Sequence, residues 1–272
     1  MKTNHFIKGL VWAAAMFTLG ILLFIIGFIV WNGFSSMNLS LFEWEYTTKN
    51  VSMMPAIIST LVVVGVSLLI AAPIGVFTGF YLVEYADRSS KILPIIRLAT
   101  DTLAAVPSIV YGLFGMLFFV NRVFGSFSHY AGILTITIMI LPIIISSTEE
   151  ALLSVHNSLR MGSLALGAGK LRTIFTVVLP VAMPGILSGL ILATGRIVGE
   201  SAALLYTLGS SSNMIRNLKS PGRTLAVHMY VLSQEGFHVK EAYSTATVLI
   251  ILVLTINWLS TRLGNKLATG GR

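Results

Sequence analysis

Long runs without charged residues follow one another along this chain, separated by short polar segments. No Asp, Glu, Lys or Arg occurs between Lys8 and Glu43 or between Lys49 and Glu84, and further apolar stretches follow. A helix needs about 20 apolar residues to cross the hydrocarbon core of a bilayer, so each stretch is long enough to cross once. The pattern predicts about six transmembrane helices, over Leu10–Trp31, Ala56–Val83, Thr102–Val120, Tyr130–Ser147, Ala182–Leu208 and Ala242–Thr261.

The composition fits a membrane protein better than a soluble one. Hydrophobic residues make up 55% of the chain and charged residues 10%, whereas a soluble domain has about 25% charged residues. The first apolar run is longer than that of a secretory signal, and no small-residue cleavage site follows it, so it is predicted to stay as a helix. We expect residues 1–272 to form a single transmembrane domain of the all-α class.

The distribution of Lys and Arg predicts the orientation. Eleven of the 18 Lys and Arg residues fall near the two termini or in the loops on the same side as the termini. Loops on the cytoplasmic side of membrane proteins carry an excess of these residues. Both termini are therefore predicted to be cytoplasmic, in a multi-pass membrane protein.

Proline and glycine mark special positions inside the predicted spans. Prolines are predicted to kink or end helices at Pro73, Pro107, Pro142 and Pro184. Glycines spaced four apart let helices approach closely in lipid. Such pairs occur at Gly75 and Gly79, at Gly185 and Gly189, and at Gly195 and Gly199.

Several kinds of chemistry have no support in this sequence. The absence of Cys excludes disulfides and thiolate metal sites. The net charge of +8 is not gathered in a continuous basic run, so nucleic acid is not an expected partner. His129, His156 and His228 lack the spacing of metal ligands and are interpreted as loop or interface residues. No G-x-x-x-x-G-K-[ST] loop is present, so no cofactor is expected on this chain.

The polar loop Glu149–Pro180 contains a short helix bounded at both ends. Ser158 is suited to cap the start of a helix over Leu159–Leu166. Gly167 is suited to stop it, because glycine adopts the left-handed conformation without a Cβ penalty. A second run, Leu171–Leu179, leads to Pro180 and the fifth span.

This loop resembles the EAA loop of ABC importer permeases, which docks on a cytoplasmic ATPase. Met161-Gly162-Ser163 occupies the Glu-Ala-Ala place, Gly167 matches the loop glycine, and Val177, Leu179 and Pro180 match its ending. Met161 departs from the pattern, since a Glu there would complete a capping box with Ser158. The resemblance implies a type I ABC importer permease fold. It implies ATPase coupling by Ser158, Arg160, Met161, Gly162, Ser163, Gly167, Leu179 and Pro180.

Two charged residues interrupt the fifth predicted span. Counting from Ala182 at 1.5 Å per residue places Arg196 about 21 Å along a helix, past the middle of a core about 30 Å thick. A charge at that depth is costly and usually marks a transport path. Arg196 and Glu200 are four residues apart, so they are predicted to share one helix face. A purely structural ion pair is the alternative.

The run Arg196-Ile-Val-Gly-Glu200-Ser201 resembles the Arg-Ala-x-Gly-Glu-Thr signature of phosphate-specific ABC importer permeases. Ala is replaced by Ile, and Thr by Ser, which keeps the hydroxyl. The segments 103–115 and 224–230 are also similar to that family, and the A-type (PstA-type) subunit fits best. The resemblance assigns the substrate path to Arg196, Glu200 and Ser201.

The resemblance also implies the partners of the chain. They are a second homologous permease, ABC ATPase subunits that carry ATP and magnesium, an extracytoplasmic phosphate-binding protein and membrane lipid. The chain itself would be a non-catalytic permease.

Three alternatives stay open. The substrate could be another oxyanion such as molybdate or sulfate. An ion-coupled secondary transporter could use Glu200, but the docking loop would then have no purpose. An intramembrane enzyme would need paired Asp residues, a Ser with a His, or an HExxH motif; Asp is absent from the six predicted spans and HExxH does not occur.

Overall fold

The computed structural model describes residues 2–87 and 91–269. Two of the basic residues counted for the orientation, Arg88 and Arg272, lie outside the described residues. Within these ranges the regular elements are helices. Five helical stretches are long and apolar enough to cross a membrane, at Ile7–Ser35, Met54–Tyr85, His129–Leu153, Lys170–Val198 and Val239–Arg262. A sixth consists of two helices that meet at a sharp bend.

The long helices are α1 (Lys2–Ser35), α2 (Met54–Phe80), α5 (His129–Leu153), α8 (Leu179–Val198) and α11 (Val239–Thr269). The shorter ones are α3 (Ile92–Ala105), α4 (Ser108–Gly115), α6 (Asn157–Ala165), α7 (Lys170–Thr173), α9 (Ala202–Leu205) and α10 (Leu225–Glu235). A 3₁₀ helix covers Leu39–Phe42, and π-helical turns cover Tyr81–Tyr85, Met116–Phe124 and Ile174–Val178. The first, second, fourth and sixth predicted spans lie inside these long helical stretches.

The third predicted span, Thr102–Val120, is not one straight helix. The chain bends by 97° between α3 and the helical stretch Ser108–Phe124. Val106, at the bend, has the extended conformation with ψ 130°. Pro107 explains the break, because the proline ring disfavours the helical conformation of the residue before it. Of the four prolines expected to kink or end helices, Pro107 ends one, while Pro73, Pro142 and Pro184 lie inside helices.

The fifth predicted span, Ala182–Leu208, is displaced along the chain. The helical stretch begins at Lys170 and ends at Val198, so it includes part of the loop predicted over Glu149–Pro180. Pro180 does not end this stretch, because it lies just after the π-helical turn over Ile174–Val178, where the backbone hydrogen bonds already depart from the regular α-helical pattern.

Three helices pack closely in the middle of the molecule. A Cβ atom added to Gly75 of α2 would lie 2.7 Å from Ile144 of α5, and one added to Gly79 would lie 2.7 Å from Thr148. Gly185 and Gly189 of α8 lie equally close to α5. These contacts explain the small residues of α2 and α8 as packing positions. The third pair is different: a Cβ on Gly195 would meet nothing within 4 Å.

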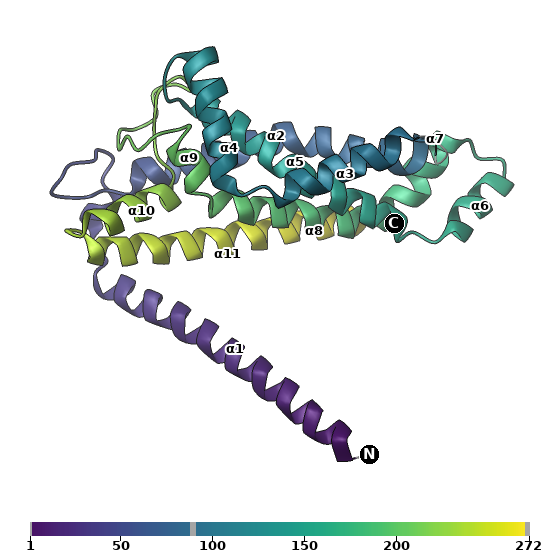
Figure 1. The fold of residues 1–272 in the computed structure, drawn as a ribbon, viewed down its shortest axis with the longest axis horizontal. Helices are drawn as coiled ribbons and strands as arrows, with labels where there is room; N and C mark the ends of the chain where they lie inside the picture. The colour runs from purple at the N-terminus through teal and green to yellow at the C-terminus, as the bar shows by residue number, and fades with distance from the viewer. Residues whose placement is uncertain (1, 88–90, 270–272) are drawn as a thin grey trace.

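Helix α1 diverges from the other helices (Figure 1). It touches α11 only near its end, where Ser244 Oγ donates a hydrogen bond to Gly33 O at 2.9 Å and Phe28 packs against the edge of Tyr243. None of its most apolar 18-residue window is buried within the chain. Its apolar surface is therefore available to lipid or to another protein.

The two ends of the helix bundle carry different structures (Figure 1). Helix α6 projects at one end, which we call the coupling-loop end. Helices α9 and α10 and two long loops, residues 36–53 and 206–224, gather at the opposite end.

Candidate functional site

Arg196 lies in the last turn of α8, close to the point where the helix ends at Val198. The sequence-based prediction placed it past the middle of the hydrocarbon core, inside a helix expected to continue to Leu208. The last turn of a helix has unpaired carbonyl groups and the negative end of the helix dipole. The backbone of α8 therefore stabilises a positive charge at this position.

A cavity of about 680 Å³ lies beside Arg196. Helices α5, α8 and α11 line it through Ile143, Ser188, Ile191, Leu192, Gly195, Arg196 and Asn257. Within the described residues, Arg196 Nε and Asn257 Oδ1 are buried and have no hydrogen-bond partner. A buried polar atom without a partner costs about 1–3 kcal/mol. The arrangement is therefore suited to a polar ligand that supplies the missing hydrogen bonds.

Asn257 was not identified from the sequence. Its signal was the one amide side chain in the predicted span Ala242–Thr261, and such residues often serve only to join helices. The open space beside Gly195 contributes to the same cavity. Thus Gly195, the first member of the third glycine pair, lines a cavity wall and does not pack against another helix.

The prediction that Glu200 shares a helix face with Arg196 is wrong. The helix ends before Glu200, and the Glu200 carboxylate accepts a hydrogen bond from Ala203 N at 3.0 Å. Glu200 is 8% exposed and caps the start of α9, where a negative charge is favourable. The ion pairs found in the described ranges do not join Arg196 to Glu200.

Ser201 lies at the start of α9, next to Glu200. Its side chain makes no capping hydrogen bond, while its backbone carbonyl accepts from Leu205 N at 2.9 Å. The structure therefore brings Glu200 and Ser201 together at a turn beyond α8. Arg196 is separated from both by the end of that helix.

Helix α6 confirms the predicted helix stop and corrects the predicted start. Gly167 has φ +81°, and the amides of Gly167 and Ala168 donate to Leu164 O and Ser163 O. This is the Schellman arrangement that a left-handed glycine makes possible. The expected cap by Ser158 is wrong, because the helix begins at Asn157, so Ser158 lies inside it.

The surface of α6 is apolar and uncovered. None of its residues is buried, and large hydrophobic side chains are exposed at Leu159, Met161, Leu164 and Leu166. Leu166 is 91% exposed. A Cβ on Gly162 would meet nothing within 4 Å, so the helix is also open at this position. Such a surface on a projecting helix is typical of a docking site for another protein.

The other predicted coupling residues lie around this helix. Ser163 and Thr173 are joined through their hydroxyl groups at 2.9 Å, which links α6 to α7. Arg160 is directed back toward the helix bundle and bonds to Glu84. Leu179 and Pro180 form the first turn of α8, beyond the loop itself.

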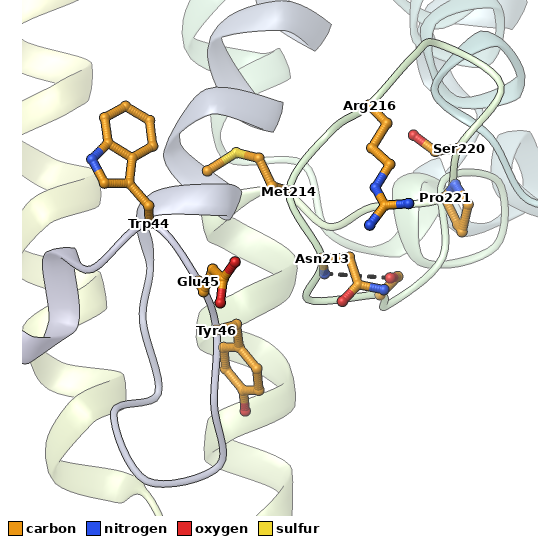
Figure 2. Close-up of a pocket in the computed structure, with 9 residues that line it drawn as sticks. Trp44, Glu45, Tyr46, Asn213, Met214, Arg216, Ser220 and Pro221 are labelled. Carbon is orange, nitrogen blue, oxygen red and sulfur yellow. Dashed lines mark hydrogen bonds between the residues drawn. The ribbon is translucent and has the colours of Figure 1, made fainter.

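A second cavity, of about 430 Å³, lies at the opposite end of the bundle. Figure 2 shows Trp44, Glu45 and Tyr46 on one loop facing Asn213, Met214 and Arg216 on another. Trp44, at the edge of the cavity, is 66% exposed. The cavity thus combines both signs of charge with an exposed aromatic side chain, which suits contact with a protein surface.

Tyr46 connects this cavity to a buried polar cluster. Arg223, which is 6% exposed, stacks on the Tyr46 ring with its Cζ 4.7 Å from the ring centroid. His228 also packs against Tyr46 and is fully buried. Burial, and then the nearby Arg223 charge, lower the pKa of His228 to about 3, so this imidazole is neutral at physiological pH. His228 was interpreted as a loop or interface residue; it lies inside α10 and packs against Tyr46 of another segment, so it is an interface residue and not a loop residue.

His129 has a structural role at the start of α5. Its Nε2 lies 2.9 Å from Ser59 Oγ, and its Nδ1 lies 2.7 Å from Ser220 O. These bonds tie α5 to α2 and to the loop before α10.

Comparison with known proteins identifies relatives that are membrane components of transport systems. Residues 71–268 match the family described as binding-protein-dependent transport system inner membrane component. The probable ABC transporter permease protein YqgI of Bacillus subtilis is 32% identical, with 97% of each chain covered. The phosphate transport system permease protein PstA of Haemophilus influenzae is 32% identical, with 93% of this chain and 91% of the relative covered.

Solved structures show the same fold. A bacterial alginate ABC transporter in complex with a pentasaccharide-bound periplasmic protein aligns with a TM-score of 0.64 and 14% identity, covering 95% of this chain and 96% of the other. An inward-facing MetNI methionine ABC transporter aligns with a TM-score of 0.58 and 21% identity, covering 81% of this chain and 94% of the other.

Proposed function

The chain belongs to the binding-protein-dependent transport system inner membrane component family, and we propose that it is the PstA-type permease subunit of an ATP-driven importer of inorganic phosphate. The observation that supports phosphate as the substrate is the Arg-Ile-Val-Gly-Glu-Ser run at 196–201, which begins beside a mostly apolar cavity that Arg196 and Asn257 help to line. Relatives that cover nearly the whole chain include phosphate permeases. Permeases of this kind are non-catalytic, and ATP hydrolysis takes place on a separate subunit.

Arg196 supplies the chemistry that a phosphate path needs. Its guanidinium stays charged when partly desolvated and offers planar donors that match phosphate oxygens. Asn257 faces the same cavity and adds an amide that can donate to a phosphate oxygen and accept from a protonated one. Few charges line the cavity, which keeps binding weak, and a transport path needs weak binding because a deep well would trap the ion.

The surfaces at the two ends of the bundle fit the expected partners. The exposed apolar side chains of α6 fit a groove on a cytoplasmic ABC ATPase subunit. The cavity between residues 44–46 and 211–221 fits an extracytoplasmic phosphate-binding protein, since its aromatic edge and mixed charges are typical of protein contacts. The exposed length of α1 is available to a second homologous permease and to lipid.

Substrate uptake by a reconstituted complex tests this proposal. Vesicles containing this chain, its sister permease and the ATPase subunits should accumulate radiolabelled phosphate when ATP and the loaded binding protein are supplied. A tenfold excess of sulfate or molybdate should leave this uptake unchanged. Accumulation of either competitor in place of phosphate would contradict the assigned substrate.

Reporter fusions test the proposed orientation. Fusions at Lys49 and Arg216 should report the outside, and fusions at Arg160 and Arg262 should report the cytoplasm, because the excess of Lys and Arg lies on the side of α6. The reversed pattern would contradict cytoplasmic docking of α6.

A further inference from the structure

The end of the second span has an irregular backbone that places Glu84 and Tyr85. Residues Tyr81–Tyr85 form a π-helical turn after α2, and Ala86 N donates to Tyr81 O at 2.8 Å. Single π turns inserted in α-helices are frequent at functional sites. Here the turn lies at the coupling-loop end, beside a cavity of about 690 Å³ that Glu84, Arg160 and Lys170 help to line.

Glu84 forms an ion pair with Arg160 of the docking helix. Arg160 Nε and Nη2 donate to Glu84 Oε1 at 3.0 and 2.9 Å. The Arg160 side chain is 16% exposed and the Glu84 side chain 10% exposed, so the pair is well shielded from water. An exposed ion pair contributes little, but a shielded, hydrogen-bonded one is strengthened by the low dielectric around it.

The same guanidinium also holds the end of α5. Arg160 Nη2 donates to Leu152 O at 2.8 Å, and Nη1 donates to Val155 O at 2.6 Å. One side chain of α6 therefore joins three segments: the π turn after α2, the end of α5 and the docking helix itself.

The next residue of the turn contacts the other side of the docking loop. Lys170 Nζ lies 4.6 Å from the centre of the Tyr85 ring, a cation–π contact. Lys170 begins α7, where the chain returns from α6 to the membrane. Consecutive residues of one turn, Glu84 and Tyr85, thus hold the outgoing and the returning arm of the loop.

The segment that receives these contacts is firmly packed. Gly75 and Gly79 of α2 lie against Ile144 and Thr148 of α5 at distances that leave no room for a Cβ. A force on α6 is therefore delivered through Arg160 to two helices that move as one body, since close-packed interfaces deform little.

We propose that Glu84 is a positioning residue for energy coupling: with Arg160 it forms the joint that makes α2 and α5 follow the docking helix when the ATPase moves. The inference rests on the proposed function, because it assigns a mechanical role to the loop that meets the ATPase. Tyr85 and Lys170 complete the joint on the returning arm.

The first test measures the coupling ratio, which is the amount of phosphate imported per ATP hydrolysed. In the reconstituted complex, E84A should lower the phosphate imported per ATP hydrolysed at least tenfold, with unchanged amounts of bound ATPase. The double variant E84A/R160A should be no worse than R160A alone, because both changes break one joint. If E84A inserts poorly, E84Q replaces it, because Gln keeps the shape of Glu and loses the charge. E84Q should also lower the phosphate imported per ATP hydrolysed, but by less than E84A.

The ion pair between Arg97 and Glu149 provides a matched control. It also lies at the coupling-loop end, but it joins α3 to α5 and includes no residue of α6, and Arg97 is 44% exposed. R97A should keep the wild-type ratio. An unchanged ratio in E84A, or a fall that matches a loss of bound ATPase, would overturn the proposed joint.

A distance measurement separates this inference from the identity of the substrate. The native chain has no Cys, so spin labels can be placed at S158C on α6 and F77C on α2, both exposed positions. Addition of ATP to the complex should leave the distance between the labels unchanged with Glu84 present and should change it by several ångströms in E84A. Equal behaviour of the two complexes would overturn the joint whatever ion is carried. Absence of phosphate uptake by the wild-type complex would overturn only the proposed function.

Discussion

An Arg196→Gln permease is expected to assemble with its partners and to import essentially no phosphate. Gln keeps one amide group near the position of the Arg196 Nε but loses the charge, the reach and the paired donors of the guanidinium. Hydrogen bonds to charged groups are each worth about 1.5–3 kcal/mol, so losing two should lower uptake on the order of hundredfold or more. Phosphate uptake into vesicles is the measurement, with assembly checked by co-purification of the ATPase.

Related variants rank the contributions at this site. Arg196→Lys should stay poor, because a point charge lacks the planar fork. Asn257→Ala should reduce uptake several-fold, since it removes the second polar group facing the cavity. Glu200→Gln should have the mildest effect, because a Gln oxygen can still accept the hydrogen bond from Ala203 N.

Arg122→Gln is a suitable control for Arg196→Gln. Arg122 undergoes the same chemical change at an exposed position after α4, and this variant should transport like the wild type. Wild-type uptake by an assembled Arg196→Gln complex would show that Arg196 is structural and that the cavity beside α8 is not the path.

A Gly167→Val permease is expected to insert normally and to lose most of its ATP-driven uptake. Gly167 has φ +81°, and the left-handed conformation costs an ordinary residue about 1–2 kcal/mol, more for a branched side chain. No atom lies within 4 Å of the added Cβ, so the effect comes from the backbone alone. The helix stop should loosen, and both uptake and ATPase association should fall about tenfold.

Gly236 offers a control with the same backbone strain elsewhere. It has φ +70°, ends α10 at the opposite end of the bundle, and also has open space around a Cβ. Gly236→Val should therefore leave ATPase association at the wild-type level. If Gly167→Val and Gly236→Val bind the ATPase equally well, the turn at Gly167 does not shape the docking helix.

Local signals in the sequence predicted most of the helices. Charge-free runs indicate transmembrane helices because an unpaired charge or backbone group in lipid is costly, whatever the neighbouring helices are. Gly167 could be predicted as a helix stop for a similar reason, since its conformation depends on its own missing Cβ. Pro107 likewise predicted the end of a helix, although the predicted third span was drawn across it.

Errors arose where a helix end depends on the surrounding chain. Glu200 was placed on the face of Arg196 by extending a regular helix through Gly199, and apolar residues on both sides gave no reason to stop it. In the structure the chain turns there and Glu200 caps α9. The first residue of α6 was missed by two positions for a comparable reason, because Ser158 is a good cap in isolation.

The sequence by itself therefore determined the membrane class, most of the spans, the short helix α6 with its glycine stop, and Arg196 as the charged residue of interest. Each of these follows from the conformation or the solvation of a residue and its near neighbours. Tertiary structure alone decided which residues meet: Asn257 joins Arg196 at one cavity, and Arg160 bonds Glu84, 76 positions earlier. Such pairs depend on how whole helices pack, and no local pattern in the chain encodes that packing.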